Sequence, residues 1–127
     1  MKNVLVVDDE HDVELLFRQR FRKETKSNLL NLNFAFSADE ALENIRTMNS
    51  EDIVMVLSDI NMPGRSGIEL LQIIKKEFPD MKVIMVSAYN DDEHRQMAES
   101  SGADDFISKP VDFSVLKERV LRELENA

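Results

Sequence analysis

The sequence predicts a doubly wound α/β fold, in which five parallel strands form one sheet with helices on both faces. Three short runs of apolar, mostly β-branched residues are typical of strands that are buried on both faces, at residues 4–7, 53–57 and 83–86. Helical patterns separate these runs, and alternating strands and helices give a parallel sheet joined by right-handed crossovers. The 127 residues are expected to form one domain, residues 1–127.

Two further strands are expected at the edges of this sheet. Residues 30–36 alternate apolar with polar side chains over most of their length, which indicates a strand with one wet face. The short run 105–108 is expected to be the last strand. A strand order of 2-1-3-4-5 places the alternating strand at one edge and the three apolar strands at the centre. Ligands of such sheets bind beyond the carboxyl ends of the strands, at the switch point between the first and third.

Four segments carry apolar stripes at helical spacing, and a fifth helix is predicted less strongly. The stripes begin at Val13, Leu42, Ile68 and Phe113. Ser37, followed three residues later by Glu40, forms a capping box that opens the second helix. The segment 92–101 offers only Met97 and Ala98 as apolar positions, so we expect it to be the least firmly held helix.

The composition argues against several classes of function. The chain has 16 Lys and Arg against 25 Asp and Glu, a net charge of −9, whereas direct binding of nucleic acid requires a basic surface. It has no Cys, and therefore neither a disulfide framework nor a thiolate zinc site. The apolar run 4–7 is far too short for a signal peptide or a membrane span. We therefore expect a cytoplasmic protein that does not contact a membrane.

Chemically distinctive side chains stand where the predicted strands end. Asp8 and Asp9 end the first strand, Asp59 the third and Ser87 the fourth, while the fifth leads into Lys109. The fold brings these strand ends to one rim of the sheet. Three carboxylates placed together repel one another unless a cation lies between them. Oxygen ligands without nearby His or Cys favour Mg²⁺ over zinc.

These residue types also fit phosphoryl transfer to a carboxylate. A carboxylate can act as a nucleophile and form an acyl phosphate. The transfer then needs positioning and neutralisation of charge, which Mg²⁺, the ammonium of Lys109 and the hydroxyl of Ser87 can provide. Taken singly, each residue has an ordinary explanation as a helix-end acid, a turn residue or a solvated lysine. Independent caps and turns would not converge on one rim with complementary chemistry.

The sequence resembles the receiver domains of two-component response regulators in four motifs, which occur in the family's order and spacing. The motifs are Asp-Asp at 8–9, Asp-Ile-Asn-Met-Pro-Gly at 59–64, Ser-Ala at 87–88 and Phe-Ile-Ser-Lys-Pro at 106–110. The resemblance spans the whole chain. It implies a flavodoxin-like (βα)5 three-layer sandwich, the fold of the chemotaxis regulators.

The resemblance also implies a role for each acidic residue of the rim. Asp59 is the expected phosphoacceptor, which receives a phosphoryl group from a sensor histidine kinase in a Mg²⁺-dependent reaction. Asp9 is expected to bind the metal directly, and Asp8 largely through water. Asn61 is expected to offer its backbone carbonyl to the same ion. On this view the domain is a signalling phosphoacceptor and not an enzyme that acts on other substrates.

By the same resemblance, Ser87 and Lys109 bind the phosphoryl group, and Ser87 with Phe106 forms the switch that changes on activation. The expected output face comprises the fourth helix, the fifth strand and the fifth helix. Its partner is a C-terminal output domain, a separate effector protein or a second copy of the domain. The Lys109–Pro110 peptide bond is expected to be cis. Many family members carry Thr in place of Ser87 and Tyr in place of Phe106, which leaves the geometry of the readout open.

Three alternatives fit the sequence less well. A haloacid-dehalogenase-type phosphatase also uses a strand-end Asp, but its acid–base residue would fall at Asn61, which cannot titrate. A flavin-binding module would need a phosphate-binding loop after the first strand, where the acidic residues 8–10 lie instead. A degenerate receiver would lack the acceptor or the lysine, and this chain has both Asp59 and Lys109.

Overall fold

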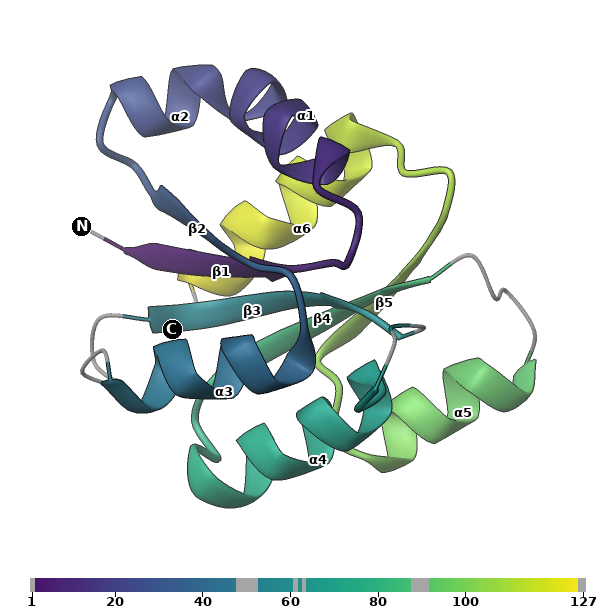
Figure 1. The fold of residues 1–127 in the computed structure, drawn as a ribbon. Coiled ribbons are helices and arrows are strands. Elements are labelled where there is room, and N and C mark those ends of the chain that lie inside the picture. The colour runs from purple at the N-terminus through teal and green to yellow at the C-terminus, as the bar shows by residue number, and fades with distance from the viewer. Residues whose placement is uncertain (1, 48–52, 61, 63, 88–91, 126–127) are drawn as a thin grey trace.

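The computed structural model describes residues 2–47, 53–60, 62, 64–87 and 92–125. Figure 1 shows one sheet, with α1, α2 and α6 on one face and α3, α4 and α5 on the other. The elements are β1 (Asn3–Val7), α1 (Asp12–Arg20), α2 (Arg22–Lys26), β2 (Asn31–Ala35), α3 (Ala38–Thr47), β3 (Ile53–Asp59), α4 (Gly67–Glu77), β4 (Lys82–Ser87), α5 (Asp92–Ser100), β5 (Asp105–Ser108) and α6 (Phe113–Glu125). Within this described part of the chain, no helix is long and apolar enough to cross a membrane.

The sheet has the predicted topology. All neighbouring strands are parallel, and their order is β2-β1-β3-β4-β5. The alternating strand β2 lies at one edge and the short strand β5 at the other, as the sequence indicates. The doubly wound α/β fold is therefore confirmed. Because the strands are parallel, the carboxyl ends of all five lie at the same edge of the sheet.

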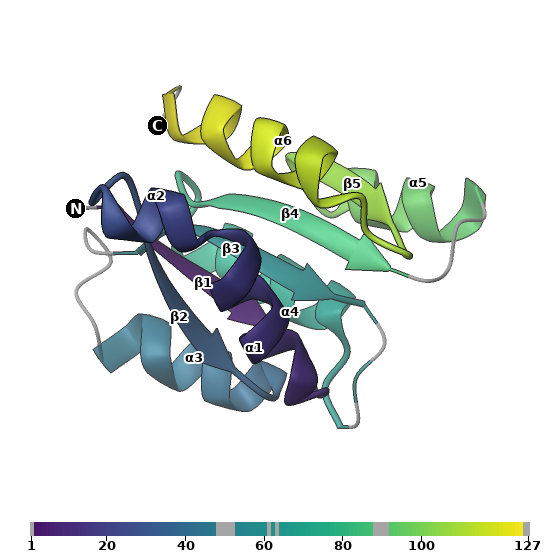
Figure 2. The same cartoon turned by 90° about the horizontal axis from the view of Figure 1, so that it is seen from above.

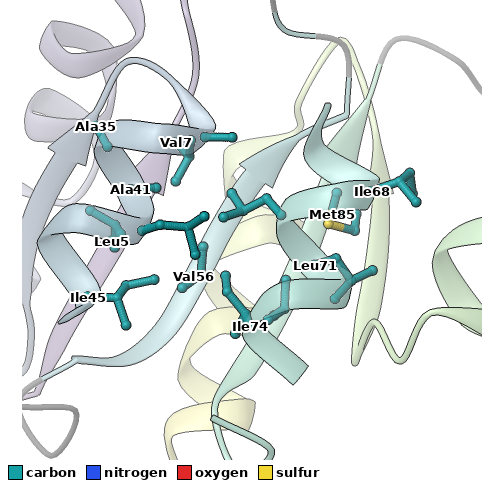
Figure 3. Packing of buried hydrophobic residues seen from close by; sticks show 14 of the residues in the cluster. Leu5, Val7, Ala35, Ala41, Ile45, Val56, Ile68, Leu71, Ile74 and Met85 are labelled. Atoms are coloured by element: carbon teal, nitrogen blue, oxygen red, sulfur yellow. The ribbon is translucent and has the colours of Figure 1, made fainter. Parts of the chain in front are cut away.

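Two apolar cores hold the helices against opposite faces of the sheet. Figure 3 shows part of the first core, in which Leu5, Val56 and Met85 of the sheet pack with Ile45 of α3 and Ile74 of α4. The second core lies on the other face, which Figure 2 views from above. There the alternate strand residues pack against α1 and α6; examples are Val4, Val6, Leu57 and Ile84. The central strands are apolar on both sides because each side faces a core.

The first helical segment differs from the expected single helix. It divides into α1 and α2 at Phe21, whose backbone (φ −100°, ψ 16°) departs from helical geometry. The hydroxyl of Thr25 donates to the carbonyl oxygens of Phe21 (3.2 Å) and Arg22 (3.1 Å), and such bonds bend helices. The Phe21 side chain is fully buried in the second core, which favours the bend.

The helix α5 is held by few apolar side chains, as expected from the sequence. Its one buried residue is Ala98, and Met97 is 46% exposed. After the helix, Gly102 adopts a left-handed backbone (φ 99°), and the N–H of Ala103 donates to the carbonyl of Ala98 (3.0 Å). A local change can easily displace a helix with so little buried apolar surface.

The start of α4 packs directly against the backbone of Asp59. Ser66 caps the helix by accepting a hydrogen bond from the N–H of Glu69 (3.2 Å), and the N–H of Gly67 donates to the carbonyl of Ile60 (2.8 Å). A methyl group at Gly67 would overlap the carbonyl oxygen of Asp59 and lie 2.8 Å from the Cα of Ile60. The absence of a side chain at Gly67 thus allows α4 to support the end of β3.

We predict that Gly67→Ala lowers the free energy of unfolding by about 1–3 kcal/mol, the usual cost of overpacking, and moves the backbone of Asp59. Urea unfolding and the amide NMR signals of Asp59 and Ile60 measure the two effects. Gly64→Ala is the control, because Gly64 has φ +79° but nothing within 4 Å of an added methyl group. That variant should lose about 1–2 kcal/mol through backbone strain and leave the Asp59 signal in place. An unchanged Asp59 signal in Gly67→Ala would show that α4 does not fix the end of β3.

Candidate functional site

Strand register places Asp8 and Asp59 side by side at the carboxyl edge of the sheet. Val7 of β1 pairs with Ser58 of β3, so the next residues lie side by side: Asp8 just beyond β1, and Asp59 as the last residue of β3. The N–H of Asp8 still donates to the carbonyl of Ala35 (3.1 Å), which fixes the first residue beyond β1 against the end of β2. The pairing of the two central strands, and not a flexible loop, therefore brings these carboxylates together.

The other side of β3 brings Ser87 and Lys109 to the same edge. Asp59 pairs with Val86 of β4, and Ser87 is the next residue. Ser87 pairs in turn with Ser108 of β5, which precedes Lys109. The backbone N–H of Lys109 donates to the carbonyl of Ser87 (2.7 Å), so the loop after β5 is tied to the end of β4.

Asp8, Asp9 and Asp59 form one acidic cluster. A carboxylate oxygen from each lies within 4.8 Å of the others. Asp8 is 6% and Asp59 is 9% exposed, so two of the three charges are almost completely removed from solvent. One oxygen of Asp8 accepts a hydrogen bond from the N–H of Glu10 (3.0 Å), which holds that carboxylate in place. The cluster combines mutual repulsion with low exposure, an arrangement that favours a bound cation.

Lys109 supplies the positive charge next to this cluster. Its Nζ lies 3.1 Å from Asp8 Oδ2 and 3.3 Å from Asp59 Oδ2. Burial lowers the pKa of the Lys109 ammonium, but the charges of Asp59 and Asp8 and the hydrogen bonds to them outweigh burial, and the pKa is raised above its usual value. Lys109 is therefore a fixed cation at neutral pH. One ammonium leaves part of the charge of three carboxylates uncompensated.

The residues of the cluster fit the Mg²⁺ expected from the sequence. All three side chains offer carboxylate oxygens, which are the ligands that Mg²⁺ binds in proteins. Asn61, the fourth predicted ligand, lies outside the described residues. The adjoining Ile60 and Met62 are buried at 6% and 7% exposure, so the chain on both sides of Asn61 is anchored in the first core.

Ser87 and Phe106 lie on the face of the sheet that carries α3, α4 and α5. Met85 and Phe106 are register partners and both belong to the first core. Ser87 follows Met85 by two residues and is therefore on the same face; its side chain is fully buried. The ring of Phe106 is 6% exposed and already points into the core. The two predicted switch residues are thus diagonal neighbours on adjacent strands.

One neighbour of the switch was not predicted from the sequence. The guanidinium of Arg95, on α5, lies 4.9 Å from the centroid of the Phe106 ring. Such a cation–π contact contributes about 0.5–1 kcal/mol at partly exposed sites. No sequence motif marks Arg95, because its importance depends on how α5 crosses β5. The role of Gly67 behind Asp59 was also missed; its only signal is its place as one of three glycines, at the start of a helix.

The loop after β5 has the expected backbone. The Lys109–Pro110 peptide bond is cis, which confirms that prediction. The backbone N–H of Lys109 and its ammonium both point to the rim, the first to Ser87 and the second to Asp8 and Asp59.

Comparison with solved structures finds the same fold in other proteins. A response regulator receiver domain protein (CheY-like) from Methanospirillum hungatei is 31% identical, with a TM-score of 0.88 over 99% of this chain and 95% of that one. The response regulator TrrA from Thermotoga maritima, solved in complex with Mg²⁺ and BeF, is 34% identical. Its TM-score is 0.82 over 96% of this chain and 98% of that one.

Sequence comparison gives the same family. A cyclic di-GMP phosphodiesterase of Thermotoga maritima is 33% identical over 123 residues, which are 97% of this chain but 31% of that protein. The chain spans less than a third of the length of the first curated relatives it matches. The family model for the response regulator receiver domain matches residues 4–121, almost the whole of the fold described above. This chain therefore belongs to the receiver domains of two-component response regulators.

Proposed function

We propose that Asp59 accepts a phosphoryl group from a sensor histidine kinase and that Mg²⁺ is required for the transfer. The observation that carries the proposal is the convergence of three carboxylates and Lys109 at adjacent strand ends. Phosphoryl transfer depends mainly on positioning and on charges that stabilise the phosphoryl oxygens, and this rim supplies both. The Mg²⁺–BeF complex of TrrA supports the choice of ion and of ligand.

In the proposed reaction, a carboxylate oxygen of Asp59 attacks the phosphorus atom of the phosphohistidine. The new bond joins that oxygen to phosphorus, and the phosphorus–nitrogen bond breaks with its electron pair going to the imidazole. The product is an acyl phosphate on Asp59. The backbone of Gly67 and the register with β4 hold Asp59 in place, so that little reorganisation is needed during the attack.

The other rim residues bind either the metal ion or the phosphoryl oxygens. Asp9 and Asp59 would hold Mg²⁺ directly, together with the Asn61 carbonyl, and Asp8 would hold it largely through water. Mg²⁺ neutralises phosphoryl oxygens when it is bound. The ammonium of Lys109, paired with Asp8 and Asp59 in this structure, turns to a phosphoryl oxygen, and the Ser87 hydroxyl donates to another. The domain thereby catalyses its own phosphorylation and dephosphorylation and is not an enzyme for separate substrates.

The signal leaves the site through α5, β5 and α6. Ser87 moves toward the phosphoryl group and vacates space beside β5. Phe106, its neighbour on the same face, can fill that space. Since this ring is already buried, phosphorylation strengthens an existing inward position more than it creates one. Arg95 connects the ring to α5, a helix with a single buried residue. A small change at Ser87 can therefore shift α5.

The proposed setting is a cytoplasmic two-component pathway. A sensor histidine kinase supplies the phosphoryl group. The output partner is a C-terminal output domain, an effector protein or a second copy of the domain at the α5–β5–α6 face. Direct binding of nucleic acid or membranes is not proposed for this domain, because the chain is acidic, with a net charge of −9. The rival phosphatase and flavin-binding functions lose their support, since the chain belongs to the receiver family.

Treatment with acetyl phosphate and Mg²⁺ should add one phosphoryl group to the chain, because Asp59 is the carboxylate supported by both neighbouring strands. Intact-mass spectrometry measures the addition. Asp59→Asn should abolish it, whereas Asp39→Asn, a change at an exposed aspartate of α3, should leave it intact. Labelling of Asp59→Asn to the same extent as the parent would show that another residue is the acceptor.

Magnesium should stabilise the fold by mass action, by about 2.7 kcal/mol at a concentration a hundred times the Kd. Thermal melts with and without the ion measure this effect. Asp9→Asn should lose most of the shift, because it removes a direct ligand. Lys109→Met should keep the shift or enlarge it, because the ammonium no longer competes for Asp8 and Asp59. A melt that Mg²⁺ leaves unchanged, or a full shift in Asp9→Asn, would count against the metal site.

Beryllofluoride with Mg²⁺ should change amide hydrogen exchange across residues 92–108, which link α5 to β5. Arg95→Ala should raise exchange in β5 before any ligand is added, because the Phe106 ring loses its cation–π contact. Arg95→Lys keeps a cation and should behave more like the parent. Protection changes that stay within the loops around Asp59 would contradict the proposed output route.

A further inference from the structure

A pocket of about 200 Å³ lies behind the acidic cluster, on the face of the sheet that carries α1 and α6. Side chains from three strands, from α1 and from the loop before α6 line it. Its apolar wall includes Val6, Val13, Phe17, Leu57, Val86 and Val111. All six belong to the second core or pack against it. The pocket is thus an incompletely filled part of that core.

The size and chemistry of the pocket fit one apolar ring. An apolar cavity of about 150 Å³ in another protein stays dry and binds benzene, and this pocket is larger. Phe17 and Phe113 meet at its wall in an edge-to-face arrangement with centroids 5.3 Å apart. Aromatic faces and edges of this kind favour another ring. The transfer of a phosphoryl group uses none of these apolar side chains.

The charged end of the pocket restricts its occupant further. Asp8, Asp59 and Lys109 line this end, together with the exposed residue Glu10. Lys109 already pairs with both carboxylates, so an added ammonium would have to displace it. An anion would lie against two nearly buried carboxylates, which is costly. An uncharged ligand meets neither penalty.

We propose that this pocket is a binding site for a small, uncharged apolar molecule of about one aromatic ring, and that its occupation weakens the binding of Mg²⁺ at the acidic cluster. The second part rests on the proposed function. An apolar ligand replaces water next to Lys109 and its two partners. Mg²⁺ keeps several waters when it binds, and Asp8 is proposed to hold it largely through water, so the loss of water from this end disfavours the ion. The ion pairs of Lys109 with Asp8 and Asp59 need no water, and the ammonium keeps both partners.

Binding can be tested with benzene as the probe and ¹³C-methyl NMR of the whole chain. Benzene should shift the methyl signals of Val6, Val13, Leu57 and Val86 in a saturable way, through its ring current. Methyl groups of the first core, such as those of Ile45, should not move. Benzoate should give no saturable shifts at the same concentration, because of the two carboxylates.

Two variants of α1 make the test specific. Val13→Phe places a ring in the pocket and should weaken benzene binding by more than about tenfold. Leu15→Phe is the matched control, because Leu15 is 75% exposed on the same helix and does not line the pocket; it should bind benzene as the parent does. Absence of saturable shifts, or equal binding in Val13→Phe and the parent, would overturn the site.

The regulatory part has its own readout. Saturating benzene should weaken Mg²⁺ binding, measured by titration calorimetry, by about fivefold or more, and Mg²⁺ should weaken benzene binding by the same factor. The effect should be absent in Val13→Phe. Benzene binding with unchanged Mg²⁺ affinity would overturn the coupling but not the proposed binding site. Failure of Mg²⁺ to bind at all would instead refute the proposed function. The methyl shifts would still show whether benzene binds in the pocket.

Discussion

The repulsion among Asp8, Asp9 and Asp59 is the constraint on which the site depends. The carboxylates cannot separate, because strand register places the first beyond β1 and the last at the end of β3. Lys109 offsets part of the repulsion, and its raised pKa reflects the field of Asp59 and Asp8 acting against burial. The site is therefore an unbalanced electrostatic arrangement, and the proposed Mg²⁺ would offset the remaining negative charge.

The rim borders a different structure on each face of the sheet. On the α3–α4–α5 face, Ser87 and Phe106 lie diagonally on adjacent strands, with Arg95 above the ring. On the α1–α6 face, the second core is incompletely filled next to Lys109. Under the two proposals, a change at the rim would reach a weakly held helix on one side, and an apolar ligand would act on the rim from the other. The sheet between them is buried on both faces.

Much of the fold and the identity of the rim residues could be predicted from the sequence, because both depend on local patterns. The apolar runs reveal the central strands, and parallel strands deliver Asp8, Asp59 and Lys109 to one edge. The split of the first helix at Phe21 could not be predicted, since it depends on the Thr25 hydroxyl and on how one ring fits its core. The contact of Arg95 with Phe106 depends likewise on the crossing of two elements. Neither leaves a periodic signal in the chain.

The most direct test of the central claim is ¹⁹F NMR of the chain with beryllium fluoride. Beryllofluoride imitates the phosphoryl group, and under the proposed function its binding would need the carboxylate of Asp59, the cation and Lys109 at the same time. We predict bound fluorine signals in slow exchange when Mg²⁺ is present, and their loss in Asp59→Asn or after removal of the ion. Bound signals that persist without Mg²⁺, or in Asp59→Asn, would contradict the claim.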